Sequence, residues 1–100
     1  MQKEDFMIFS QFTDNLVMTL SRSLMQIEDA EEPVTAGSPL LEKNIAKLAI
    51  QFGHFQTESL PILQKYMKES NSSRLLYVTD IFSSHDFLYY LLVSDEYENV

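Results

Sequence analysis

SPLLEKNIAKLAIQFGHFQTESLPILQKYMKE, residues 38–69, decides the fold because it predicts a long central helix. Ser38 suits the N-cap position, where a side-chain oxygen can accept a hydrogen bond from an early helical amide. Pro39 then falls on the first helical position, where its missing N–H is not needed. Glu42 places negative charge in the first turn, near the positive end of the helix dipole.

The apolar residues of this stretch recur at spacings of three and four, which lines one helical face. This face consists of Leu41, Ile45, Leu48, Ala49, Phe52 and Phe55, and the opposite face carries Lys43, Lys47, His54 and Glu58. Pro61 removes one helical hydrogen bond and crowds the preceding turn. The apolar stripe nevertheless continues in phase through Leu63, Tyr66 and Met67. We therefore predict one helix kinked near Pro61; the alternative is a break with Ser59 capping a new helix.

A first helix is predicted from about Glu4 to Ile27, and it carries apolar residues on two faces. One broad stripe comprises Phe6, Phe9, Phe12, Leu16, Val17, Leu20, Leu24 and Ile27. Met7, Met18 and Met25 fall together on nearly the opposite side, with Ile8 at the margin. Three helices in a short chain cannot easily cover both faces, so we interpret the methionine side as an interface. The alternative is that the methionines are simply part-exposed, as single surface apolar residues often are.

Turn signals divide the remainder of the chain. Residues 28–37, EDAEEPVTAG, form an acidic linker that we expect to be the most flexible part. Asn71, Ser72 and Ser73 predict a stop and restart, with a helical segment running from Arg74 to about Ser94. Residues 83–86 interrupt that segment, and Ser83 with Asp86 resembles a capping box, so two short helices are an alternative. Residues 87–93 are apolar on all sides and fit either a buried helix or a strand. Residues 95–100 predict a frayed acidic tail.

Composition bounds the class of protein. One hundred residues suit a single domain, and two Gly and three Pro provide few turns for short strands. We therefore predict an all-α fold, a small bundle of three to four helices. Without cysteine there is no disulfide framework, and the first residues lack a signal-peptide pattern, so we expect a soluble, cytoplasmic protein. The net charge of −8, with scattered Lys and Arg, disfavours nucleic-acid backbones and acidic membranes.

No residue pattern predicts catalysis, a metal or a cofactor. Ser84, His85 and Asp86 are consecutive, so their side chains diverge by about 100° on a helix and cannot form a relay. We expect His85 to be partly buried against a carbonyl or hydroxyl, or else to act as a pH-sensitive element of an interface. His54 lies one turn before Glu58, and the two could pair weakly. Two histidines without cysteine do not make a zinc site.

These features predict a non-enzymatic protein-protein interaction module, working as a homodimer or in a heteromer. Its partner would be another protein, possibly basic, and candidate roles are an inhibitor, an immunity or antitoxin-like protein, or a chaperone that occludes its partner. The predicted partner-binding residues are Met7, Met18, Met25, Glu28, Asp29, Glu31 and Glu32. Methionine adapts its shape to binding surfaces, and the carboxylates would speed association with a basic surface. The alternative function is a transcription regulator with a helix-turn-helix, although no helix shows a basic face for the major groove.

Overall fold

The chain forms a small all-α bundle, as predicted. The structure, a computed structural model, describes residues 2–93. Its elements are α1 (Lys3–Glu28), α2 (Pro39–His54), the π-helical turn η1 (Phe55–Ser59), α3 (Leu60–Gln64), α4 (Glu69–Phe82) and α5 (His85–Val93). Within these residues there is no strand, so residues 87–93 are helical and the strand alternative is wrong. The predicted acidic tail lies outside the described residues.

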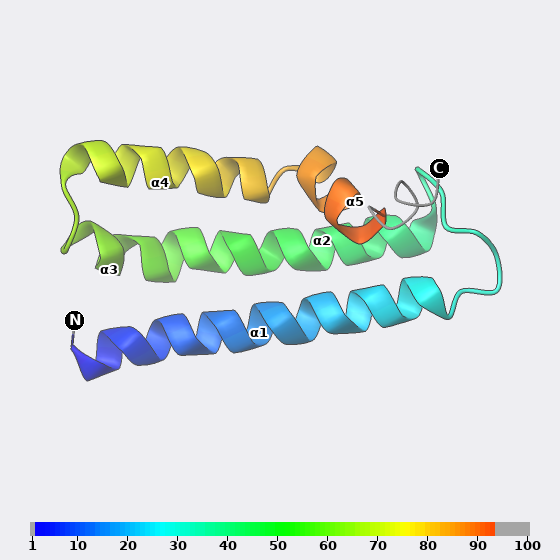
Figure 1. Cartoon of the computed structure of the whole chain (residues 1–100), viewed down its shortest axis with the longest axis horizontal. Helices are drawn as coiled ribbons and strands as arrows, with labels where there is room; N and C mark the ends of the chain where they lie inside the picture. The colour runs from blue at the N-terminus through cyan, green and yellow to red at the C-terminus, as the bar shows by residue number, and fades with distance from the viewer. Residues whose placement is uncertain (1, 94–100) are drawn as a thin grey trace.

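The central helix lies between two others. Figure 1 shows α2 flanked by α1 on one side and by α4 on the other, with α5 crossing back over α2. The bundle measures 47 × 25 × 22 Å, so it is elongated along the helices. Each outer helix therefore covers one side of α2 and leaves much of its own surface uncovered.

The hydrophobic core gathers at the end of the bundle where α5 crosses α2. The predicted stripe is confirmed there, because Leu41, Ile45 and Leu48 are buried. Apolar residues from α5 and from the connection after α1 close this core: Val34, Leu88, Leu92 and Val93. Residues 87–93 form one short helix over this stripe, so most of the apolar side chains of that run pack against the core.

Polar side chains join α1 to α2 in the interior. Ser23, the one fully buried residue described in α1, donates a hydrogen bond from Oγ to Asn44 Oδ1 at 2.9 Å. The Asn44 amide donates to Gln26 Oε1 at 3.2 Å and to the Leu40 carbonyl at 2.9 Å. A buried amide with one acceptor and two donor bonds is satisfied, and satisfaction requires one particular register of the two helices.

The acidic connection is attached to the core at Val34, while its predicted flexibility stays a prediction. Val34 is buried in the core cluster, although the four predicted acids around it are exposed. Gly37 has φ of 82°, a left-handed conformation that suits glycine, in the turn closed by Ser38 N–H to Thr35 O. Ser38 occupies the predicted N-cap position, but its side chain makes no cap hydrogen bond.

The helix passes Pro61 without a break. Leu60 N–H donates to Phe55 O across the π-helical turn η1, which directly precedes the proline. Thr57 Oγ1 donates to the Gly53 and His54 carbonyls at 3.2 and 3.3 Å, which satisfies acceptors in the widened turn. The helix is thus continuous from α2 through α3; a kink near Pro61 stays a prediction.

The predicted apolar stripe continues only in part beyond Pro61. Leu60 and Ile62 are buried, whereas Tyr66, predicted on the stripe, lies beyond the end of α3 and is half exposed. The π-helical turn inserts an extra residue and rotates the following face. The helix also ends at Gln64 rather than near Glu69.

The boundaries of α4 and α5 differ from the predicted ones. Helix α4 begins at Glu69, so the polar run 71–73 lies inside it instead of starting a new helix. The last segment forms two helices, so the alternative of two helices is confirmed and the single helix from Arg74 to about Ser94 is wrong. Ser84, not Ser83, caps α5, because its Oγ accepts a hydrogen bond from Phe87 N–H at 3.3 Å.

Phenylalanine rings and one glutamine attach α4 to the centre of the bundle. Phe52 on α2 lies 6.2 Å from Phe12 on α1 and 6.2 Å from Phe82 on α4, measured between ring centroids. Gln56 Nε2 donates to Asp80 Oδ1 at 2.7 Å and to Thr79 Oγ1 at 3.1 Å. The middle of the molecule is therefore held by aromatic contacts from three helices.

Replacing Asn44 by alanine is expected to lower the free energy of unfolding by about 1–3 kcal/mol, because Ser23 Oγ loses its buried acceptor. Urea titration followed by circular dichroism measures this change. Asn71→Ala on the exposed surface of α4 is the matched control and should shift stability by less than about 0.5 kcal/mol. Equal effects of the two substitutions would contradict the role assigned to Asn44.

Asp5→Ala is expected to lower the pKa of Tyr66. The Tyr66 hydroxyl donates to Asp5 Oδ2 at 2.7 Å, and this hydrogen bond raises the pKa of the phenol above its ordinary 10.0. The stabilising contribution is present below the ordinary pKa and is lost as pH rises through the raised value. NMR titration of the Tyr66 ring measures the shift, with Glu4→Ala as the control. A pKa equally unaffected by both substitutions would exclude this hydrogen bond.

Candidate functional site

The predicted methionine row lies on the outer surface of α1. Met7, Met18 and Met25 are 58%, 47% and 61% exposed. Part of the opposite stripe is exposed as well, namely Phe6, Val17 and Leu24. The expectation that this stripe would be buried is therefore wrong for these three residues, because α2 covers only one narrow face of α1.

The predicted acidic residues are exposed at one end of the methionine row. Glu28 ends α1, and Asp29, Glu31 and Glu32 follow it in the connection. They follow Met25 in the chain and line none of the hollows described below. They form an acidic edge beside an apolar surface.

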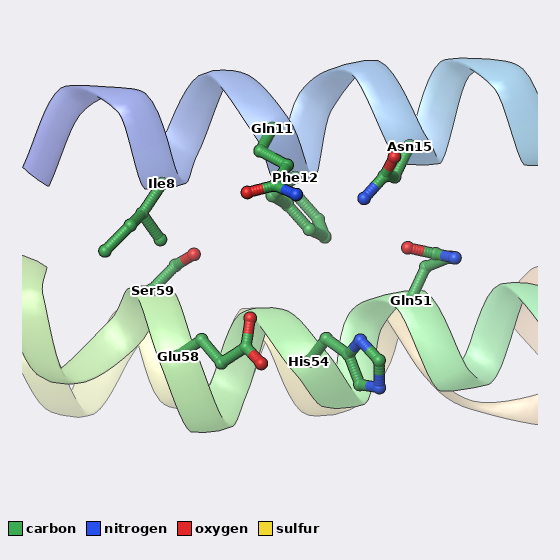
Figure 2. Close-up of a pocket in the computed structure, with 8 residues that line it drawn as sticks. All are labelled: Ile8, Gln11, Phe12, Asn15, Gln51, His54, Glu58 and Ser59. Carbon is green, nitrogen blue, oxygen red and sulfur yellow. The ribbon is translucent and has the colours of Figure 1, made fainter. Parts of the chain in front are cut away.

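A polar hollow separates α1 from α2 and η1 at the other end of the bundle, where sequence reasoning found no site. Its volume is about 440 Å³. Two apolar side chains, Ile8 and Phe12, form part of its wall. Its six polar side chains come from both helices: Gln11, Asn15, Gln51, His54, Glu58 and Ser59. Figure 2 shows the amides of α1 and the Glu58 carboxylate extending into the space between the two helices.

The polar side chains of this hollow are not used in holding the fold. Within residues 2–93, none of the six makes a side-chain hydrogen bond to another protein group. The predicted pairing of His54 with Glu58 does not occur there, since the ion pairs among the described residues all involve His85. Their donors and acceptors remain available to solvent or to a ligand.

Ser59 is the most informative of these residues. It is 1% exposed, yet its hydroxyl bonds to no protein group in the described chain. Figure 2 shows the Ser59 hydroxyl directed into the space between η1 and α1. The hydroxyl is open to the hollow, because no buried side-chain oxygen or nitrogen of the described residues lacks a partner, and π-helical turns are frequent at functional sites.

A second hollow adjoins the first along α1. It has a volume of about 670 Å³ and shares Ile8, Gln11 and Asn15 with the polar hollow. Glu4, Asp14 and Met7 also line it. On the described part of the chain, no Lys or Arg lines either hollow. The pair of hollows therefore carries three carboxylates, with His54 as its one basic side chain among the described lining residues.

His85 lies elsewhere, on the outside of the α2–α5 contact. The expectation of a partly buried histidine bonded to a carbonyl or hydroxyl is wrong, because its side chain is 54% exposed and its Nε2 is 3.0 Å from both Glu42 carboxylate oxygens. The ring stacks on Tyr89 with centroids 6.5 Å apart. Ser84 Oγ donates to the Ile81 carbonyl, so Ser84, His85 and Asp86 do not form a relay. The contact between His85 and Glu42 therefore joins α5 to α2.

An apolar hollow of about 220 Å³ lies beneath α4. It is lined by Phe12, Phe52, Phe55, Leu75, Val78, Thr79 and Phe82. Because Thr79 already bonds to Gln56 and to the Leu76 carbonyl, no unpartnered polar group points to a ligand there.

Within residues 2–93, no three His, Asp, Glu or Cys side chains are placed to hold a metal ion. Among the same residues, every helix is too short or too polar to cross a membrane.

Comparison with known proteins gives no match: no family model, curated sequence or solved structure is significantly similar to this chain.

Sequence reasoning missed the polar hollow because each residue that lines it looks ordinary alone. Gln11 and Asn15, four residues apart, were a detectable signal, because Gln51 and His54, three residues apart, also place two polar side chains about one turn apart on the central helix. Ser59 carried no such signal, since its position depends on the π-helical turn.

Two serines that are equally buried, at 1% exposure each, should respond differently to alanine. Ser23→Ala should destabilise the fold by about 1 kcal/mol or more, because Asn44 loses its donor. Ser59→Ala should change stability by less than about 0.5 kcal/mol, because its hydroxyl has no protein partner within the described residues. Thermal unfolding of both variants measures the difference. A loss at Ser59 as large as that at Ser23 would show that the Ser59 hydroxyl is structural.

Proposed function

We propose that this protein is a non-enzymatic interaction module that covers a partner protein with the outer surface of α1. The observation that carries the proposal is the exposed methionine row of α1, Met7, Met18 and Met25. Extended exposed apolar surfaces are typical of sites for protein partners.

The size of the surface supports a specific complex. Helix α1 has 26 residues and extends about 39 Å at 1.5 Å per residue. A typical specific interface covers about 800 Å² on each partner. A helix of this length, exposed along its methionine side, provides a surface of that order.

Charge favours a basic partner over a second copy of the chain. Asp14 lies between Met7 and Met18 on the same side of α1, and the exposed acids after Met25 extend it. The chain carries a net charge of −8, so two copies meeting through this surface would place carboxylates near one another. A partner with an apolar patch edged by Lys and Arg would avoid this repulsion.

The role that fits such binding is occlusion of the partner, as an inhibitor, an immunity or antitoxin-like protein, or a chaperone. An adaptable methionine surface suits a binder that conforms to its partner. No residue of the described structure favours one of these three roles over the others.

The double substitution Met18→Glu/Met25→Glu is expected to weaken the complex at least tenfold, because it introduces charge where apolar side chains make contact. A partner captured from native extract is purified, and its affinity for each variant is measured by calorimetry. Ser70→Glu/Ser73→Glu on exposed positions of α4 is the matched control and should change the affinity less than about twofold.

Circular dichroism and light scattering complete this test. The methionine variant should keep the helical content of the wild-type chain. Unchanged affinity of the folded variant would remove α1 as the binding surface. A wild-type homodimer that the methionine variant dissociates would replace the basic partner by a second copy.

A further inference from the structure

The polar hollow between α1 and η1 has the features of a site for one side chain of a ligand. Its volume of about 440 Å³ falls within the range of ligand pockets, about 300–1,000 Å³. Ser59 is 1% exposed, and its hydroxyl points into the hollow without a protein partner among residues 2–93. No buried side-chain oxygen or nitrogen of the described residues is left without a partner, so this hydroxyl is open to the hollow, where water or a ligand group can bond to it.

The charge of the lining selects a cation. Glu58 is its carboxylate, and Glu4 and Asp14 line the adjoining hollow. No Lys or Arg lines either hollow on the described chain, and His54, which lines the first hollow, makes no ion pair with Glu58. An anionic ligand would be repelled, and a neutral one would leave the carboxylates without a counter-charge.

The arrangement of acceptors favours a guanidinium over an ammonium. Oxygen acceptors come from both sides of the hollow, from Gln11 and Asn15 on α1 and from Glu58 on η1. A guanidinium offers five N–H donors in one plane, whereas an ammonium offers three around a point. The wall also contains the Phe12 ring, and a guanidinium stacks on aromatic faces.

We propose that the hollow between α1 and η1 receives an arginine side chain of the partner protein, with Glu58 as its counter-ion and Ser59 and the lining amides as hydrogen-bond partners. This inference rests on the proposed function, because it assigns an anchor residue to the same partner. Met7 lines the adjoining hollow and also begins the methionine row. A partner lying on the methionine row therefore reaches the hollow without a gap.

The test uses N-acetyl-arginine amide as the probe and NMR of the side-chain amides of Gln11, Asn15 and Gln51 as the readout. The lysine and citrulline counterparts supply an ammonium and a neutral isostere. Saturable shifts of these amides are expected with the arginine probe, with an affinity about fivefold or more above that of the lysine probe. The citrulline probe should produce no saturable shift.

Glu58→Gln is expected to weaken arginine binding about tenfold, because the charge-assisted bonds are lost while the shape of the side chain is kept. Glu69→Gln, which removes one exposed carboxylate on α4 outside the hollow and the methionine row, is the matched control and should leave binding unchanged. Shifts spread over the acidic connection, equal affinity for lysine and arginine, or indifference to Glu58→Gln would overturn the site.

Calorimetry with the purified partner separates this inference from the proposed function. If both are correct, Glu58→Gln and Met18→Glu/Met25→Glu each weaken the complex. If only the methionine variant weakens it, the surface stands and the arginine anchor is wrong. If the arginine probe binds the hollow but Glu58→Gln leaves the complex unchanged, the ligand is a free guanidinium compound and the partner's arginine is excluded.

Discussion

The hydrogen bonds of Asn44 are the constraint on which the rest of the structure depends. An apolar contact between α1 and α2 would tolerate sliding by one helical turn, because each turn presents a similar apolar face. Asn44 does not tolerate it, since its amide needs Ser23 and Gln26 of α1 at the same time. A single buried polar residue can set helix register in this way. The same register brings Gln11 opposite Glu58 and so creates the polar hollow at the far end.

The hollow depends equally on the π-helical turn before Pro61. Proline cannot donate the hydrogen bond that a regular helix requires at its position, and the wider turn accommodates the change. The extra residue buries Leu60 and directs Ser59 toward α1. The irregular backbone hydrogen bonding of η1 therefore contributes to the shape of the polar hollow. The candidate site lies where the helix departs from its ideal period, and two of its polar residues, Glu58 and Ser59, belong to the π-helical turn.

The sequence predicted regular features well and irregular ones poorly. Leu41, Ile45 and Leu48 repeat with the period of a helix, so the core face of α2 was predictable. Tyr66 was misplaced because the helix ends before it, at Gln64, and no sequence pattern indicated the π-helical turn that contains Ser59. His85 was misplaced because the helix breaks before it and α5 restarts in a new direction (Figure 1). The exposed methionines were predicted because two apolar faces on one outer helix exceed what a small bundle can cover.

Because of the position of the core, one half of the molecule has many buried apolar contacts (the firm half) and the other has few (the soft half). The core cluster gathers where α5 crosses α2, while the opposite half buries only Leu60 and Ile62 among the described apolar side chains. Local opening is easiest where few apolar contacts must be broken. The hollow occupies the soft half, so its walls can adjust to an occupant at little cost to global stability. Occupation would then tighten the bundle from its weaker end and couple recognition to local order.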